Sequence, residues 1–478
     1  MTRKLLLPFL LLGALIGQAQ VPGYEIQVTL KPFKDQYVYL GHYFGKTYPI
    51  VDSVKLDANS KGVFRGDKSL PGGIYLIGYP AKNQFFEILI DKQQRFSVVA
   101  DTAMVAQTIG FVNSPDNIAF LNYQQKMRDF GTRIRTLQEQ IQSGRPDSNQ
   151  LRNQLAKIDR EMNQYRKVLI DSSGETLLGA LMKAMREPEL PASLKKPTTA
   201  ADSLVAYRYY KENYWEGVNF WDGRLAYTPF FEDKVERYFK QLVSPDADSV
   251  IFEIDNMMAF AQINSEMSRL LLIKFLNRYL TQQYMWEDAV LVHLYEKYIA
   301  NKTYPWLEEK GRKLVQDRAY SLMANILKSP AAEVELPDAG GTTRSLYALS
   351  AEYTLVIFWD PTCGHCKETL PRIDSIYQKK WSKQSVGIYS IAKETEGDQK
   401  MWTDFIEQNQ LEQWTHVYYS KNTEKQRIEN GIPGYSQLFD VQSFPTLYLL
   451  DREKKIIAKK LTFQQMDEIM DSQRADKK

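Results

Sequence analysis

Residues 354–371, TLVIFWDPTCGHCKETLP, contain the only two cysteines of the 478-residue chain, Cys363 and Cys366. The segment before them, 355–359 (LVIFW), is apolar and rich in β-branched and aromatic residues, which predicts a buried parallel strand. After the cysteines, apolar residues three positions apart, beginning with Leu370, predict a helix. A strand that leads into a helix with Cys-x-x-Cys at the junction indicates a site for thiol–disulfide exchange.

The position of each cysteine in this motif suggests its role. A helix N-terminus carries positive potential from unpaired N–H groups, which favours the thiolate form of Cys363. His365, when protonated, adds to this effect. Cys363 is therefore the expected nucleophile, and Cys366, one turn further along the helix, is expected to resolve the mixed disulfide.

Other uses of a Cys-x-x-Cys pair fit the sequence less well. A structural disulfide across two residues would be strained and would not explain the strand–helix context. A zinc site needs further ligands, but there is no second Cys-x-x-Cys, and His42, His293 and His416 show no ligand spacing. Haem attachment requires a histidine directly after the second cysteine, where Lys367 stands. The sequence thus predicts no metal and no cofactor.

Length and composition set the wider frame. A chain of 478 residues should hold about two to four domains, and its 44% hydrophobic residues are ample for packed cores. The net charge of +3 is too small to indicate nucleic-acid binding. With two cysteines, no disulfide framework staples the fold.

Residues 1–20 have the pattern of a signal peptide. Two basic residues precede the apolar run Leu5–Ile16, and a small-residue pattern follows, with cleavage expected after Ala19 or Gln20. No later apolar run approaches the ~18 residues that span a membrane. We therefore expect a soluble exported protein, located in the periplasm.

Three regions follow the signal peptide. In residues 21–110, apolar and polar positions alternate between turn signals, which predicts a small antiparallel β-sandwich. Residues 111–330, opening at Ser114-Pro115-Asp116, have helical periodicity and predict an all-helical domain. Residues 331–478 alternate between strand and helix patterns, as in an α/β domain. The expected fold class is therefore a multidomain protein with an N-terminal β-sandwich, a central all-α domain and a C-terminal α/β domain.

The C-terminal region resembles the TlpA-like and ResA-like thioredoxin-fold domains of exported thiol–disulfide oxidoreductases. The resemblance rests on two motifs, FWDPTCGHCK at 358–367 with Pro371 and FPT at 444–446. It implies a thioredoxin fold, with the family's cis-proline at Pro445 beside the cysteines. The residues that it implies for contact with the substrate are Trp359, Gly364, Phe444 and Thr446. The regions upstream resemble the β and all-helical domains of uncharacterised function that precede such modules in some exported bacterial proteins.

The chain departs from the family pattern where a proton acceptor for Cys366 is expected. Ile357 takes the place of the buried aspartate of thioredoxins, and Thr369 that of a glutamate found in many TlpA-like proteins. Glu368 is one position early, which turns it about 100° away on the helix. Water and Glu368 in an adjusted pose are the candidates for this role. The Gly-His pair between the cysteines resembles the eukaryotic disulfide isomerases, which are more oxidising than thioredoxin.

The sequence therefore predicts an exported thiol–disulfide oxidoreductase that acts as a reductase or an isomerase. Its partners would be client proteins with disulfides or thiols. Because no third cysteine could recycle the pair, an external thiol donor, such as a membrane carrier, is also expected. The alternative is a binding or scaffold protein whose thioredoxin-like domain senses redox state or docks a partner.

Overall fold

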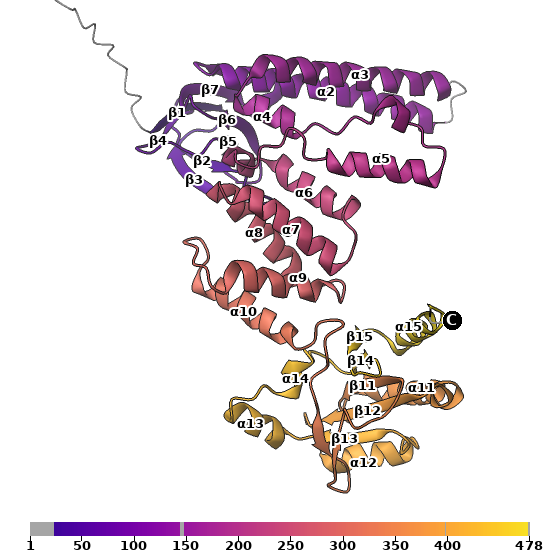
Figure 1. The fold of residues 1–478 in the computed structure, drawn as a ribbon. Coiled ribbons are helices and arrows are strands. Elements are labelled where there is room, and N and C mark those ends of the chain that lie inside the picture. The colour runs from indigo at the N-terminus through magenta and orange to yellow at the C-terminus, as the bar shows by residue number, and fades with distance from the viewer. Residues whose placement is uncertain (1–22, 144–147, 397, 477–478) are drawn as a thin grey trace, which may run out of the picture. The chain divides into compact units, whose positions relative to one another are not determined.

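The computed structural model of the chain describes residues 23–143, 148–396 and 398–476 (Figure 1). The predicted signal peptide, residues 1–20, lies outside these ranges. The chain divides into two compact units: one runs up to Leu242 and includes Phe260–Leu270, and the other combines Val243–Ala259 with the residues from Leu271 onward. Within the described ranges, no helix combines the length and apolarity needed to cross a lipid bilayer.

The first unit contains two four-stranded sheets, with strand orders β4-β1-β7-β8 and β3-β2-β5-β6. Apolar side chains alternate along β1, so that Ile26, Val28 and Leu30 are buried in the core that the sheets share. β1 and β7 pair in parallel, whereas the other pairs in these sheets are antiparallel, so the predicted antiparallel sandwich includes one parallel pair. The strands are β1 (Tyr24–Lys31), β2 (Tyr37–His42), β3 (Ile50–Lys55), β4 (Lys61–Gly66), β5 (Gly73–Gly78), β6 (Phe85–Ile90), β7 (Arg95–Asp101) and β8 (Gly110–Val112), with the short helix α1 (Val105–Thr108) before β8.

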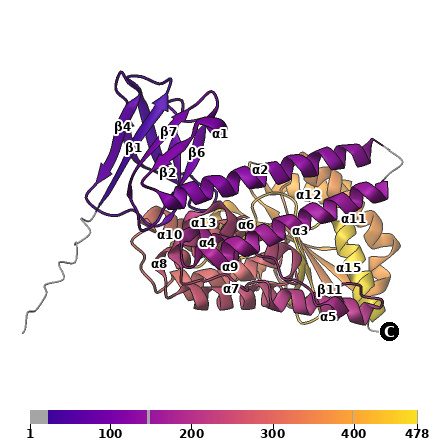
Figure 2. The same cartoon turned by 90° about the horizontal axis from the view of Figure 1, so that it is seen from above.

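Helices follow the sheets in the first unit. α2 and α3 are long and lie side by side as an antiparallel hairpin (Figure 2), and an ion pair of 2.9 Å between Arg133 and Glu161 joins them. The residues between the two helices, Arg145-Pro146-Asp147, have a sequence that predicts a turn, and they lie outside the described residues. The helices are α2 (Pro115–Gln142), α3 (Ser148–Ser173), α4 (Leu177–Ala184), α5 (Ala200–Glu212) and α6 (Pro229–Gln241), with 3-10 turns at Ala192–Leu194 and Gly223–Tyr227.

Helical structure continues into the second unit. The helices are α7 (Ala247–Ala261), α8 (Ser265–Leu280), α9 (Glu287–Leu294), which a π-turn at Tyr295–Ile299 extends, and α10 (Glu309–Met323). The end of α7 and the start of α8, within Phe260–Leu270, are counted with the first unit, and the rest of these helices with the second. Asp255 of α7 accepts hydrogen bonds from His293 at 2.9 Å and from Tyr298 at 2.7 Å. These contacts tie α7 to α9 and the turn behind it.

The C-terminal part of the second unit is built on a five-stranded sheet with strand order β13-β12-β11-β14-β15. β11, β12 and β13 are parallel, β14 is antiparallel to β11, and β15 is antiparallel to β14. The strands are β9 (Glu335–Pro337) and β10 (Thr343–Ser345), which form a hairpin, and β11 (Tyr353–Trp359), β12 (Val386–Lys393), β13 (Thr415–Tyr419), β14 (Thr446–Leu450) and β15 (Ile456–Lys459). The helices are α11 (Gly364–Lys379), α12 (Gln399–Gln408), α13 (Lys421–Glu429), α14 (Tyr435–Leu438) and α15 (Phe463–Asp476), with a 3-10 turn at Trp381–Gln384.

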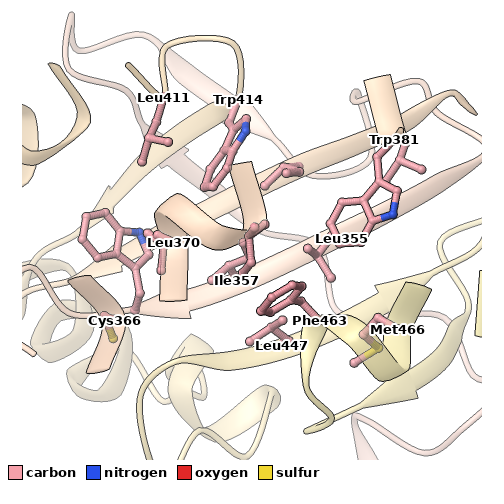
Figure 3. Packing of buried hydrophobic residues seen from close by; sticks show 14 of the residues in the cluster. Leu355, Ile357, Cys366, Leu370, Trp381, Leu411, Trp414, Leu447, Phe463 and Met466 are labelled. Carbon is pink, nitrogen blue, oxygen red and sulfur yellow. The ribbon is translucent and has the colours of Figure 1, made fainter. Parts of the chain in front are cut away.

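The central strand β11 is buried on both faces, as its apolar sequence predicts. Leu355, Ile357 and Trp359 face the core beneath α11, α12 and α15, and part of this packing is visible in Figure 3. Val356 and Phe358 point to the opposite face, which α14 and the β9 strand cover. The predicted fold class is confirmed: N-terminal β-sheets, a helical region and a C-terminal α/β domain.

Candidate active site

A tight turn carries the chain from the end of β11 into α11. The Cys363 N–H donates to the Asp360 carbonyl at 3.1 Å, and the Asp360 carboxylate accepts from the Thr362 N–H and hydroxyl, each at 2.7 Å. An aspartate that binds the backbone two residues on is a common device for stabilising turns. The turn places Cys363 at the N-cap of α11, which begins at Gly364.

The two cysteines, which are free thiols here, lie in different environments. Cys363 is half-buried, whereas Cys366 is fully buried and belongs to the same core cluster as Leu370 (Figure 3). Burial raises the pKa of the Cys366 thiol well above its ordinary value, and the neighbouring Cys363 and the Asp360 charge raise this pKa further. A backbone hydrogen bond from Asp360 acts in the opposite direction and lowers it. One sulfur is therefore accessible to a partner, and the other is held protonated beneath it.

The loop before β14 lies against Cys363. The Phe444–Pro445 peptide bond is cis, as the resemblance implies. The Cys363 thiol donates a weak hydrogen bond to the Phe444 carbonyl at 3.8 Å, which joins residues 81 positions apart. Phe444 and Pro445 are half-buried. The structure thus brings together three of the predicted site residues, Cys363, Phe444 and Pro445.

Gly364 and His365 form the exposed first turn of α11, next to Cys363. Cys366 follows at the third helical position, facing inward. The helix N-terminus therefore presents its positive potential at Cys363.

Two predicted substrate contacts need correction. Trp359 is fully buried and donates its indole N–H to the Ser390 hydroxyl at 2.8 Å, because the β11 register points this side chain into the core. The Thr446 side chain is also buried, and its hydroxyl donates to the Ser443 carbonyl at 2.6 Å. Neither side chain is available to a client in this structure.

The residues at the family's proton-acceptor positions are placed as follows. Ile357 lies in the core, the Thr369 side chain is buried, and Glu368 is exposed on the solvent side of α11. The carboxylate that the structure does bring close to the cysteines is Asp360, which is only 6% exposed. Asp360 stands within the motif itself, but no local pattern in the sequence shows that its carboxylate is buried near the cysteines.

No group of three or more His, Cys, Asp or Glu side chains among the described residues is arranged to hold a metal ion.

Comparison with known proteins gives one family-model match and several similar solved structures. Residues 351–456 match the family model of thioredoxin-like proteins. Three similar solved structures are a domain of a possible thiol-disulfide isomerase from Cytophaga hutchinsonii (29% identity, 31% of this chain and 94% of that chain, TM-score 0.27), a thioredoxin-like protein from Bacteroides caccae (22%, 60% and 97%, 0.41) and a thiol:disulfide interchange protein from Bacteroides sp. (24%, 31% and 91%, 0.27). No curated protein matches the chain.

The same assignment follows from the sheet order, from the placement of Cys363 at the start of α11 and from the family model. The C-terminal part of this chain is a thioredoxin-like domain.

Proposed function

We propose that the protein is a thiol–disulfide oxidoreductase that exchanges disulfides with client proteins through Cys363 and Cys366. The observation that carries this proposal is the contrast between the two sulfurs: Cys363 is accessible at the start of α11, beside Phe444 and Pro445, and Cys366 is buried one turn away. An accessible thiolate that attacks and a protected thiol that resolves are the two parts that dithiol exchange requires.

In the reducing direction, the Cys363 thiolate attacks one sulfur of a client disulfide. The client S–S bond breaks, a Cys363–client disulfide forms, and the released client thiolate takes a proton from solvent. The Cys366 thiol then loses its proton and attacks the Cys363 sulfur, which releases the second client thiol. Two electrons pass to the client, and the Cys363–Cys366 pair ends as a disulfide. In the isomerising direction, a second client thiol resolves the mixed disulfide, with no net electron transfer.

The residues around the cysteines have supporting roles in this proposal. His365, when protonated, stabilises the Cys363 thiolate together with the helix N-terminus. Gly364, Phe444 and Pro445 border the accessible sulfur and would contact the extended client segment.

The proposal extends to location and partners. The signal-peptide pattern of residues 1–20 supports export to the periplasm, with cleavage near Ala19 or Gln20. Because the chain has only two cysteines, an external thiol donor, such as a membrane carrier, would return the pair to the dithiol form. Residues 21–110 and 111–330 would then be the β-sandwich and helical domains that precede the thioredoxin-like domain at 331–478.

Reduction of insulin disulfides by the purified protein, with dithiothreitol as the electron donor, tests the activity. We expect the wild-type protein to accelerate insulin precipitation and Cys363→Ser to give only the uncatalysed rate. Ser375→Ala is the matched control, because this exposed side chain lies further along the same helix. If the wild-type protein gave no more than the uncatalysed rate, the oxidoreductase proposal would fail and the binding or scaffold alternative would take its place.

A further inference from the structure

The segment between α8 and α9, residues 281–286 (TQQYMW), carries a pair of aromatic side chains at the surface and no charged residue. Tyr284 is 59% exposed, and its ring lies parallel to that of Trp286, with 6.2 Å between the centroids. Met285 stands between them and is half-buried. Aromatic side chains and methionine are enriched where proteins bind other proteins. We call residues 281–286 the aromatic loop.

Buried polar contacts fix the backbone of the aromatic loop. The fully buried Glu287 carboxylate accepts hydrogen bonds from the N–H groups of Gln283 at 2.6 Å and Tyr284 at 3.2 Å. The same carboxylate pairs with Arg278 of α8. A segment that is already held in one conformation loses little freedom when a partner binds, which favours binding.

Strand register places the aromatic loop near the edge of the sheet that carries the cysteines. The first turn of α9 is joined to the end of β15 by the ion pair of Asp288 and Lys459. There, the Lys460 N–H donates to the Leu447 carbonyl of β14 at 2.7 Å, and Leu447 pairs in turn with β11. Because neighbouring strands lie about 4.8 Å apart, the end of β15 is about 10 Å from the end of β11, which leads to Cys363.

Side chains also connect the aromatic loop to the segment of the cis-proline. Met285 packs against the same core cluster as Phe444. The Gln282 side-chain oxygen accepts from the Arg318 guanidinium at 2.6 Å, and Arg318 donates to the Asp440 carboxylate at 2.8 Å, four residues before Phe444. All these residues belong to the second unit. The aromatic loop and the proposed site of exchange therefore form neighbouring parts of one surface.

We propose that the aromatic loop forms one wall of the surface that binds clients, and that Tyr284 is a specificity-determining residue that contacts an apolar side chain next to the reacting client cysteine. The proposal rests on the function proposed above and adds a preference among clients. The charged side chains beside the loop are paired with one another, so the loop offers aromatic surface. This surface fits an apolar client segment better than an acidic or basic one.

The experiment compares two peptide dimers, each joined by a single disulfide, that differ only next to the cysteine: one has phenylalanine and leucine there, and the other has serine. The full-length protein in its dithiol form is mixed with each dimer in excess. Two electrons pass from the Cys363–Cys366 dithiol to the peptide disulfide, which yields two peptide thiols. Alkylation of the thiols at successive times gives the second-order rate constant, which is divided by that of dithiothreitol with the same dimer.

For the wild-type protein, we expect the apolar dimer to react at least about tenfold faster than the serine dimer, because aromatic contacts dominate the energy of protein interfaces. In Tyr284→Ala, this preference should fall to within about twofold, through a slower reaction of the apolar dimer alone. The rate constant of the serine dimer should stay within about twofold of the wild-type value.

Two further variants serve as controls. Tyr284→Phe keeps the aromatic ring and should keep the preference. Ile428→Ala removes another apolar side chain, which is 61% exposed on α13. α13 follows β13, the strand at the opposite edge of the sheet from β15, so this variant should also keep the preference.

The outcomes separate the two proposals. If the wild-type protein reduced neither dimer, the proposed function would fail. If it reduced both without a preference, or if Tyr284→Ala kept the preference, this inference alone would fail. Equal slowing of both dimers in Tyr284→Ala would also overturn it, because the substitution would then act on the thiols and not on a contact with the apolar side chain.

Discussion

At the scale of single residues, His416 shows how the fold controls a charge state. The ring lies on β13, stacks on Trp414 with 5.6 Å between centroids, and donates from Nε2 to the Leu411 carbonyl at 2.8 Å. Its Nδ1 is buried with no hydrogen-bond partner among the described residues. Burial lowers the pKa of His416 to about 4. The folded domain therefore holds a neutral histidine under conditions in which the unfolded chain would protonate it.

This difference predicts a specific loss of stability in acid. The unfolded chain takes up a proton as the pH falls below about 6.5, and the folded protein does so only near pH 4, so stability falls between these values. From pH 7 to pH 5, we expect His416 to account for on the order of 1–2 kcal/mol of lost unfolding free energy. This loss of unfolding free energy is measured by urea denaturation of the wild-type protein and of His416→Gln at both pH values. Equal pH dependence of the two proteins would contradict the prediction.

The two sulfurs predict different outcomes for their serine variants. Cys366→Ser leaves the Cys363–client disulfide with no resolving thiol, so covalent complexes with clients should accumulate. Cys363→Ser removes the accessible nucleophile and leaves only a buried thiol, so it should trap few or none. Non-reducing electrophoresis after incubation with a disulfide-containing client measures the complexes. Equal trapping by Cys363→Ser would mean that the assigned roles are reversed.

At the scale of elements, α11 is held against the sheet by its inner face. Cys366, Leu370 and Ile373 are fully buried in the core cluster, and Lys367 is exposed. Leu370→Ala should reduce the unfolding free energy by about 2–5 kcal/mol, because it opens a cavity beneath the helix that carries both cysteines. Lys367→Ala should change it by no more than about 0.5 kcal/mol. Chemical denaturation measures the unfolding free energy of both variants. A similar loss in Leu370→Ala and Lys367→Ala would argue against this packing.

The sequence predicts these elements well where a local pattern determines them. The apolar run 355–359 and the apolar spacing after the cysteines correctly indicate β11 and α11. Contacts between segments that are far apart in the sequence cannot be predicted from a local pattern of residues. The Asp360 carboxylate meets Thr395, 35 residues away, only when β11 and β12 lie in register. The same register turns Trp359 into the core, so a motif residue expected to contact substrate is a packing residue. The parallel β1–β7 pair is likewise a long-range contact.

At the scale of the molecule, the second unit joins helices to the thioredoxin-like sheet through buried charges. Lys459 of β15 pairs with Asp288 of α9 and also donates to the Asn325 side chain at 2.6 Å. Asp440, after α14, pairs with Arg318 of α10 at 2.8 Å and with Lys460. Burial opposes the charge on Asp440, but Lys460 and Arg318 outweigh it and hold the pKa of this carboxyl below its usual value.

These contacts bear on how the chain is divided. The sequence predicts a helical domain at 111–330 and a separate α/β domain at 331–478, because the periodicity of the apolar residues changes between them. The compact unit that contains the thioredoxin-like sheet also includes Leu271 onward. Sequence patterns mark where elements begin and end, whereas the packing of α9 and α10 depends on charges more than 100 residues away, as the separation of Arg318 and Asp440 by 122 residues illustrates.

The Lys459–Asp288 pair gives a quantitative test of this joint. Both side chains are almost fully buried, at 1% and 3% exposure. Lys459→Met keeps the apolar stem but leaves Asp288 as an uncompensated buried charge, which should cost about 3–5 kcal/mol of unfolding free energy. Adding Asp288→Leu removes that charge, so the double variant should recover at least about 2 kcal/mol relative to Lys459→Met, because a buried pair can be replaced by apolar side chains at little net cost. Chemical denaturation of the full-length wild-type, single and double variants completes the cycle. Costs that simply add would mean that the two charges do not depend on each other, and that α9 is held to the sheet by other contacts.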